Sequence, residues 1–267
     1  KELPKEMLPI YLWDKNGNIV LKPLLQAVFE QFYEYGIREF CFIVGRGKRA
    51  IEDHFTPDWD YVKRISNKVK TELLTGILDF YEMIENSTIV WINQPEPKGF
   101  GHAVFMARSF VESEPFIACA GDTFVLTDKS DFLNKMVTIH LKHNADSTLL
   151  IHKVTDPRQY GVAVAEKIEN YTYKVIEVLE KPEKPPSDMA VIPYYIFSPN
   201  VMEVLRKTKP SVNNEIQLTD AIQSLIDAGG EVLAVFLSPD ESKIDVGTPE
   251  TYWEALSISY NRLRNIK

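Results

Sequence analysis

Two aspartates stand where an acidic side chain could do chemistry. Asp122 follows a glycine at the end of the apolar segment in "FIACAGDTF", and Asp245 ends a shorter one in "KIDVGTPETYWEA". Carboxylates are the ligands that Mg²⁺ takes together with substrate phosphates. Asp122 could equally cap the turn that follows it. The turn after Asp245 is explained by Thr248 and Pro249 as the start of a helix, and does not need Asp245.

Two lysines have the chemistry of phosphate contacts. Lys181 follows Glu180 at the end of the strand-like segment "YKVIEVLEKP", and Lys5 lies between the prolines of "LPKEMLP". A surface ion pair is the ordinary interpretation of Glu180 and Lys181. A lysine held at a strand end is also a suitable point charge for a phosphate, and Glu180 could accept hydrogen bonds from sugar hydroxyls.

The loop "NQPEPKGFGHAV" joins an apolar run to a helical pattern. Its Gly-x-Gly, at Gly99 and Gly101, is weak support for a phosphate at a helix N-terminus, and the third glycine of a dinucleotide fingerprint is missing. Gln94 is more informative, because a carboxamide carries a donor and an acceptor side by side. That pair matches N3–H and the adjacent carbonyl of uracil or thymine, and glycine would let the backbone approach the same base edge.

The elements that must position these residues follow an alternating pattern up to about residue 155. Apolar runs alternate with helical patterns, which predicts an α/β fold with an open, mostly parallel, Rossmann-like sheet flanked by helices. Ligands then lie at the carboxyl ends of the strands. Helices are expected near 24–35, 69–85, 103–110, 131–143, 199–205, 218–228 and 248–263. Short strands after residue 155 predict a smaller mixed or antiparallel lobe; that this lobe binds the sugar is implied by the family resemblance given below.

The organisation we expect is a single domain over residues 1–267. Residues 1–155 would form its nucleotide-binding part, and residues 156–267 its sugar-binding part with the C-terminal helix. That helix, with Trp253 and Tyr260, would pack on its own domain or on a second subunit of a homo-oligomer.

Composition excludes several classes of protein. The net charge of -8 argues against nucleic-acid binding, which needs a basic face. No run of 18 apolar residues is present, so no membrane partner is expected. Cys41 and Cys119 lie in apolar runs without zinc-site spacing, which favours buried thiols and a cytoplasmic location.

Eight segments in order, from Leu3 to Tyr252, resemble the sugar-phosphate nucleotidyltransferases, and within them the UTP–glucose-1-phosphate uridylyltransferases. They are "LPKEMLPI", "VGRGKRAIEDHF", "QPEPKGFGHAV", "GDT", "DPRQYGV", "VLEKP", "NEIQLTDAI" and "DVGTPETY". The resemblance implies the nucleotide-diphospho-sugar transferase fold. It also implies Mg²⁺-dependent transfer of a uridylyl group from UTP to glucose 1-phosphate, giving UDP-glucose and pyrophosphate.

The resemblance also implies a role for each matching residue. Lys5 and Lys181 would be the catalytic lysines, on the nucleotide phosphates and the sugar phosphate respectively. The remaining matches are Glu6, Gln94 and Gly99 for the nucleotide, Gly161 and Glu180 with Lys181 for the sugar phosphate, and Asp122 and Asp245 for the metal.

The sequence departs from the family pattern at several places. Thr123 replaces a second aspartate, and Phe100 replaces a smaller aliphatic residue. Residues 11–23 are longer than the family's short turn, and "NGN" predicts a hairpin there. The family's glycine-rich loop, with its arginine, is expected to lie before Lys1.

Other functions remain open on the sequence alone. Gln94 reads an edge that uracil and thymine share, so a thymidylyltransferase using dTTP, or an enzyme for another hexose 1-phosphate, is an alternative. A non-catalytic nucleotide-sugar-binding regulatory protein on the same fold is a second alternative. A nicotinamide-dependent dehydrogenase is disfavoured by the missing third glycine.

Overall fold

The computed structural model divides into two compact units that alternate along the chain. The first unit takes Lys1–Asn93, Gly121–Leu126 and Lys243–Lys267, and the second takes Gln94–Ala120 and Thr127–Ser242. The structure describes residues 3–66, 68–69, 71–127 and 131–265. The sequence predicted a division of the chain by function at residue 155, into a nucleotide-binding part and a sugar-binding part. That division stays a prediction.

The first unit opens with a short 3-10 turn, η1 (Lys5–Met7), and an antiparallel hairpin of β1 (Pro9–Trp13) and β2 (Ile19–Pro23). The Asp14 side chain closes the hairpin, because its Oδ1 accepts the N–H groups of Asn16 at 2.9 Å and Asn18 at 2.7 Å. The hairpin predicted from "NGN" is therefore confirmed.

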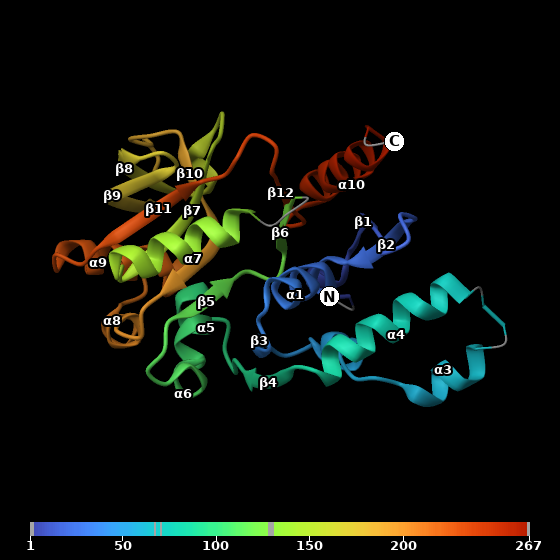
Figure 1. Cartoon of the computed structure of the whole chain (residues 1–267). Helices are drawn as coiled ribbons and strands as arrows, with labels where there is room; N and C mark the ends of the chain where they lie inside the picture. Colours follow the sequence, from blue (N-terminus) through green and yellow to red (C-terminus); the bar gives the residue numbers. More distant parts are fainter. Residues whose placement is uncertain (1–2, 67, 70, 128–130, 266–267) are drawn as a thin grey trace. The chain divides into compact units, whose positions relative to one another are not determined.

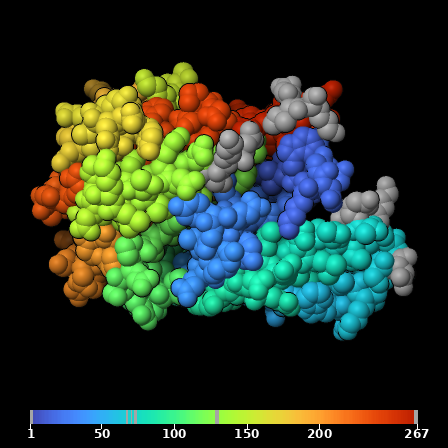
Figure 2. All heavy atoms as spheres, in the orientation of Figure 1, coloured from blue at the N-terminus to red at the C-terminus, as the bar shows by residue number. Residues whose placement is uncertain are grey.

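A parallel pair of strands, β3 (Glu39–Val44) and β4 (Thr88–Asn93), lies in the same unit. Helix α1 (Leu24–Tyr35) follows Pro23 and ends at Gly36, whose φ of 115° is in the left-handed region, as the sequence predicted. The other helices before β4 are α2 (Arg49–His54), α3 (Trp59–Ile65) and α4 (Thr71–Glu85). The sequence predicted α4 but neither α2 nor α3, which are too short to show a clear apolar period. Figure 2 shows α3 and α4, cyan and teal, at the surface of the molecule.

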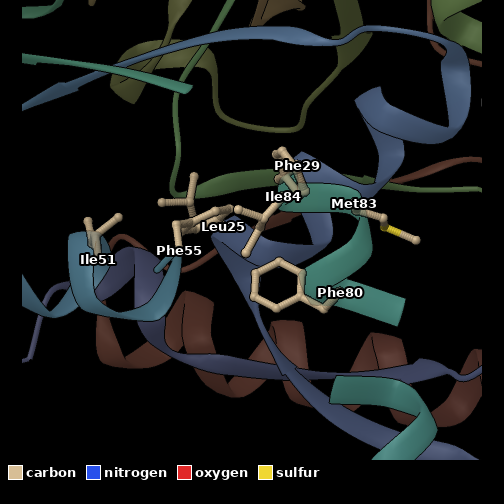
Figure 3. Packing of buried hydrophobic residues seen from close by; sticks show 7 residues of the cluster. All are labelled: Leu25, Phe29, Ile51, Phe55, Phe80, Met83 and Ile84. Carbon is tan, nitrogen blue, oxygen red and sulfur yellow. The ribbon is translucent and has the colours of Figure 1, made fainter. Parts of the chain in front are cut away.

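Aromatic side chains fill the core between α1, α2 and α4. The buried members of this cluster are Leu25, Phe29, Ile51, Phe55, Phe80, Met83 and Ile84 (Figure 3). The ring of Phe29 meets those of Phe55 and Phe80 edge-on, with centroids 5.2 and 6.1 Å away. Such geometry adds about 0.5–1.5 kcal/mol per pair to the burial itself.

The first unit closes with β6 (Thr123–Leu126) beside β12 (Ser242–Asp245), followed by α10 (Pro249–Asn265). The predicted cap of α10 is confirmed, because Thr248 Oγ1 accepts the N–H of Thr251 at 3.2 Å. Thr251 Oγ1 accepts the N–H of Thr248 in return at 3.0 Å, so a threonine takes the place that glutamate has in a capping box.

A six-stranded sheet forms the second unit. Its order is β5 (Phe116–Cys119), β10 (Met189–Phe197), β7 (Ser147–Lys153), β11 (Val232–Phe236), β9 (Thr172–Glu180) and β8 (Gly161–Glu169). β7 and β11 run parallel, whereas the other neighbours in this sheet are antiparallel. The α/β class is confirmed, with a more mixed sheet than the sequence predicted. α7 packs against β7 and β11, and the buried residues at the centre of both strands are apolar whichever way their neighbours run.

The helices predicted at 131–143, 199–205 and 218–228 are present to within two residues, whereas the single helix predicted at 103–110 is two short helices. The helices of this unit are α5 (Phe100–Met106), α6 (Arg108–Val111), α7 (Asp131–His143), α8 (Val201–Lys207) and α9 (Leu218–Asp227), with 3-10 turns η2 (Pro157–Gln159) and η3 (Val212–Asn214). Figure 1 shows α7 lying along the sheet, while α5 contacts α8 and α9. In the described part of the chain, no helix combines the length and apolarity needed to cross a bilayer.

Candidate functional site

The two predicted metal ligands lie close together in the first unit. Asp122 immediately precedes β6 and Asp245 ends the neighbouring β12. The N–H of Val246 donates to the carbonyl of Asp122 at 3.2 Å. Thr123, which replaces the family's second aspartate, places its hydroxyl 3.5 Å from Asp245 Oδ2. The fold thus brings the two carboxylates together, as a shared site requires.

Two lysines neutralise these carboxylates. Lys5 Nζ lies 2.5 Å from Asp122 Oδ2, and Lys243 Nζ lies 3.7 Å from Asp245 Oδ2. Burial lowers the pKa of Lys5, but the hydrogen bond and charge of Asp122 outweigh that effect, so the pKa is raised. Burial lowers the pKa of Lys243, with the charges of Asp245 and Asp122 opposing it.

Sequence reasoning missed Lys243, whose side chain is only 10% exposed. Its signal was present, because it lies two residues before Asp245 on β12 and alternate strand residues share a face. The interpretation that the turn does not need Asp245 was wrong, since Asp245 Oδ1 accepts the N–H of Gly247 at 2.8 Å. One carboxylate oxygen of Asp245 therefore holds the turn, and the other faces Thr123 and Lys243.

Glu6 lies beside this cluster and has its own lysine. Lys48 Nζ is 2.7 Å from both carboxylate oxygens of Glu6. A Cβ on Gly121 would lie 3.1 Å from Leu25 Cδ1 and 3.4 Å from Glu6 Cγ, so the glycine before Asp122 lets these side chains approach. Lys48 comes from the "GRGKRA" segment and was also missed.

In the second unit, the loop of Gln94 is fixed to the segment before α9. Gly99 has φ of 95°, and a Cβ there would lie 2.7 Å from Glu215 Cβ and 2.8 Å from the carbonyl oxygen of Ile216. Gly101 donates its N–H to that carbonyl at 2.9 Å, and the N–H of Ile216 donates to Lys98 O at 2.8 Å. Gly99 and Gly101 are therefore needed because the loop packs closely against residues 215–216 of the protein itself. The sequence interpretation had considered only a close approach of the loop to a base.

Within that loop, the side chain of Gln94 is held by two neighbours. Its Nε2 is 3.3 Å from the carbonyl oxygen of Gly99 and 3.0 Å from His102 Nδ1. Sequence reasoning predicted Gln94 and Gly99, and missed His102.

Glu180, Lys181 and Gly161 meet at one end of the β8–β9 pair. Gly161 and Glu180 are register partners across these strands. Lys181 Nζ lies 3.7 Å from Glu180 Oε1, and the N–H of Lys181 donates to Tyr160 O at 3.0 Å. Lys181 has φ of 43°, a left-handed conformation that non-glycine residues adopt at a cost and that is concentrated at functional sites.

Thr219 of α9 anchors Glu180, and sequence reasoning had not singled it out. Its Oγ1 donates to Glu180 Oε2 at 3.0 Å. A Cβ on Gly161 would lie 3.0 Å from Thr219 Cγ2 and 3.4 Å from Glu180 Oε2, so Gly161 leaves room for both. The Glu180 side chain is 13% exposed. Burial raises its pKa, against the hydrogen bond from Thr219 and the charge of Lys181.

The predicted residues therefore form groups that lie inside single units. Lys5, Glu6, Asp122 and Asp245 cluster in the first unit. Gln94 with Gly99, and Gly161 with Glu180 and Lys181, form two groups in the second. Among the described residues, no group of three or more His, Cys, Asp or Glu side chains is suited to hold a metal. A site built by Asp122 and Asp245 would use two carboxylates and leave the other positions to phosphate or water.

Clustered carboxylates and lysines, with a carboxamide loop on an α/β scaffold, suit a protein that binds phosphates. Residues 15–261 match the family model described as "Nucleotidyl transferase", and the chain belongs to this family.

Particular relatives agree with that assignment. The UTP–glucose-1-phosphate uridylyltransferase of Pseudomonas aeruginosa is 33% identical over 268 residues, covering 98% of this chain and 90% of the relative. The enzyme of that name from Bacillus subtilis is 34% identical, covering 92% of this chain and 80% of the relative. The resemblance stated from eight motifs is thereby confirmed.

Solved structures support the same family. A UDP-glucose pyrophosphorylase complexed with UDP-glucose has a TM-score of 0.83 and 30% identity, covering 97% of this chain and 91% of that one. A UTP-bound enzyme of this kind from Acinetobacter baumannii has a TM-score of 0.80 and 26% identity, covering 98% of this chain and 91% of that one.

Proposed function

We propose that the protein transfers a uridylyl group from UTP to glucose 1-phosphate, giving UDP-glucose and pyrophosphate. The supporting observation is the cluster of Asp122 and Asp245 with Lys5 and Lys243, which gathers paired charges at adjacent strand ends. Relatives bearing the name of this activity match nearly the whole chain.

The chemistry needs positioning and charge neutralisation. An oxygen of the sugar phosphate attacks the α-phosphorus of UTP in line, and pyrophosphate leaves on the opposite side. The attacking oxygen is ionised at neutral pH, so no general base is required. Preorganised positive charge lowers the barrier to such a transfer. Lys5 would neutralise the nucleotide phosphates and Lys181 the sugar phosphate.

Asp122 and Asp245 would hold Mg²⁺, which prefers one or two carboxylates together with substrate phosphates. The donor set fits, because both side chains present hard oxygen atoms and Lys5 now supplies positive charge beside Asp122. The ion, when bound, would add positive charge against the phosphate oxygens.

The groups of the second unit suit the two ends of the product. Gln94 would read the base, and Glu180 would accept a hydrogen bond from a glucose hydroxyl. Gly161 adds no side chain beside Glu180 and Thr219. Glu6 would lie near the nucleotide, with its carboxylate held by Lys48.

The use of dTTP or of another hexose 1-phosphate stays an alternative, because uracil and thymine share the edge that Gln94 would read. Retention of both aspartates and of Lys181 disfavours a non-catalytic regulatory role. A cytoplasmic location and a homo-oligomer stay predictions. Cys41 and Cys119, predicted to be buried thiols, are only partly buried. Partial burial raises the pKa of the Cys41 thiol to about 11.

Pyrophosphate release from UTP and glucose 1-phosphate, with Mg²⁺ present, tests the proposal. Asp122→Asn should lower turnover by about 10²-fold or more, taking the loss of one charge-stabilising group as the scale. Asp60→Asn is the matched control, because Asp60 is 87% exposed on α3, and its turnover should equal the wild type. Near-normal turnover of Asp122→Asn would contradict the assignment.

A further inference from the structure

In the part of the chain that the structure describes, the carboxamide of Gln94 forms hydrogen bonds through its Nε2 end only. Its Nε2 lies 3.3 Å from the carbonyl oxygen of Gly99 and 3.0 Å from Nδ1 of His102. His102 is in the first turn of α5, and the loop before it is bonded to Ile216 on both sides of Gly99. The partners of Gln94 are therefore fixed by backbone hydrogen bonds.

These partners determine which end of the amide is the NH2 group. A carbonyl oxygen can only accept, so the end of Gln94 that faces Gly99 must be Nε2. That nitrogen has two protons, and Gly99 O takes one of them. The second is available for His102, whose Nδ1 must then accept, with the ring proton on Nε2.

The charge state of His102 agrees with an accepting Nδ1. Burial lowers the pKa of His102, and the charges of Lys98 and Arg108 lower it further, against the opposing charge of Glu96. A neutral ring at neutral pH keeps the lone pair that the hydrogen bond to Gln94 needs.

With both protons of Nε2 engaged, Oε1 is the end of Gln94 left for a ligand, so Gln94 offers the base an acceptor and not the donor–acceptor pair expected from the sequence. An oxygen acceptor suits the N3–H of uracil or thymine. Cytosine has an unprotonated N3 at the same place, so two acceptors would face each other without a proton between them. A site that offers the wrong hydrogen-bonding group to a base rejects it strongly.

We propose that His102 contributes to base specificity, because its Nδ1 and the carbonyl oxygen of Gly99 together fix the polarity of the Gln94 carboxamide, so that uracil is accepted and cytosine is refused. This inference rests on the proposed function, in which Gln94 reads the base. His102 acts through Gln94 and has no contact of its own with the base, so it is a positioning residue.

The test compares UTP with CTP in the full chain and in variants of His102. In His102→Leu or His102→Ala, Nε2 loses one of its two acceptors, so the amide is held in this orientation less firmly by the carbonyl oxygen of Gly99. The UTP-to-CTP ratio of kcat/KM should fall by about tenfold, the worth of one hydrogen bond. His102→Asn is the matched variant, because its Oδ1 can take the place of Nδ1 as acceptor, and it should retain the wild-type ratio. The KM for glucose 1-phosphate should not change in any of them.

A double-mutant cycle shows whether His102 acts through Gln94. In the Gln94→Ala background, His102→Leu should leave the UTP-to-CTP ratio unchanged. The inference is overturned if His102→Leu keeps the wild-type ratio, or if it has the same effect with and without Gln94.

Calorimetric binding of UTP and CTP to the same variants separates this inference from the proposed function. If the wild type binds UTP in preference to CTP but never releases pyrophosphate with glucose 1-phosphate, the proposed function fails, and the binding ratios still test His102. If the wild type binds UTP and CTP equally, the inference fails even when turnover is fast.

Discussion

A methyl group added at Gly101 tests whether the loop of Gln94 is held by close backbone packing. In Gly101→Ala, the new Cβ would lie 2.7 Å from Ile216 O and 3.2 Å from the carbonyl carbon of Gln217. Both are backbone atoms, which cannot rotate away as a side chain does. The hydrogen bond from Gly101 N–H to Ile216 O, now 2.9 Å, must lengthen to relieve the contact.

The expected magnitude follows from three terms. Overpacking costs about 1–3 kcal/mol, and a weakened backbone hydrogen bond costs about 1 kcal/mol. Alanine gains up to about 1 kcal/mol over glycine in a helix. The sum is a fall of about 1–4 kcal/mol in the free energy of unfolding. The KM for UTP should also rise, because the loop carries Gln94.

Gly76 is the matched control, because it is also a helical glycine, in α4. Among the described atoms outside the backbone of its own helix, none lies within 4 Å of a Cβ added there. Gly76→Ala should raise the free energy of unfolding by about 0.5–1 kcal/mol, and leave the KM for UTP unchanged. Urea unfolding and steady-state kinetics measure both quantities. If Gly101→Ala is as stable as Gly76→Ala, the packing argument is refuted.

Three further predictions concern the sugar-phosphate end. Lys181→Ala should lower kcat/KM for glucose 1-phosphate by about 10²-fold and leave the KM for UTP unchanged. Lys184 is exposed, so Lys184→Ala should have the kinetics of the wild type. Equal kinetics of the two variants would exclude the role of Lys181. Thr219→Val keeps the methyl group beside Gly161 but removes the hydroxyl that donates to Glu180, so it should raise the KM for glucose 1-phosphate about fivefold to tenfold. Thr219→Ser keeps the hydroxyl and should leave this KM unchanged. Identical effects of the two variants would refute the positioning of Glu180 by the hydroxyl. Burial raises the pKa of Glu180, so its carboxylate is protonated at a higher pH than usual, and the KM for glucose 1-phosphate should rise as pH falls through that raised pKa. Glu180→Gln should abolish this rise, and its persistence would assign the titration to another group.

Helices with a long apolar stripe were predictable from the sequence. The expected helix at 131–143 coincides with α7, because its buried residues Phe132, Leu133, Met136 and Ile139 recur at helical spacing. The direction of strand pairing was not predictable from the sequence. The apolar pattern of β7 reflects its coverage by α7, and it is the same whether a neighbouring strand runs parallel, as β11 does, or antiparallel, as β10 does.

Site residues were predictable where they stand at strand ends or in motifs. The contacts between Thr219 and Glu180, and between Lys48 and Glu6, join segments far apart in the chain, and no local pattern reports such pairs. The second role of Asp245 needed the structure as well, because only the fold shows that Gly247 donates to it.

The measurement that tests the central claim most directly is product formation by the full chain with Mg²⁺. UTP or dTTP would be crossed with glucose 1-phosphate, galactose 1-phosphate and N-acetylglucosamine 1-phosphate, and both pyrophosphate and the nucleotide sugar would be quantified. The account predicts the highest kcat/KM for UTP with glucose 1-phosphate, with UDP-glucose and pyrophosphate in equal amounts. No product from any pair, while UDP-glucose still binds, would contradict it and identify a nucleotide-sugar-binding protein.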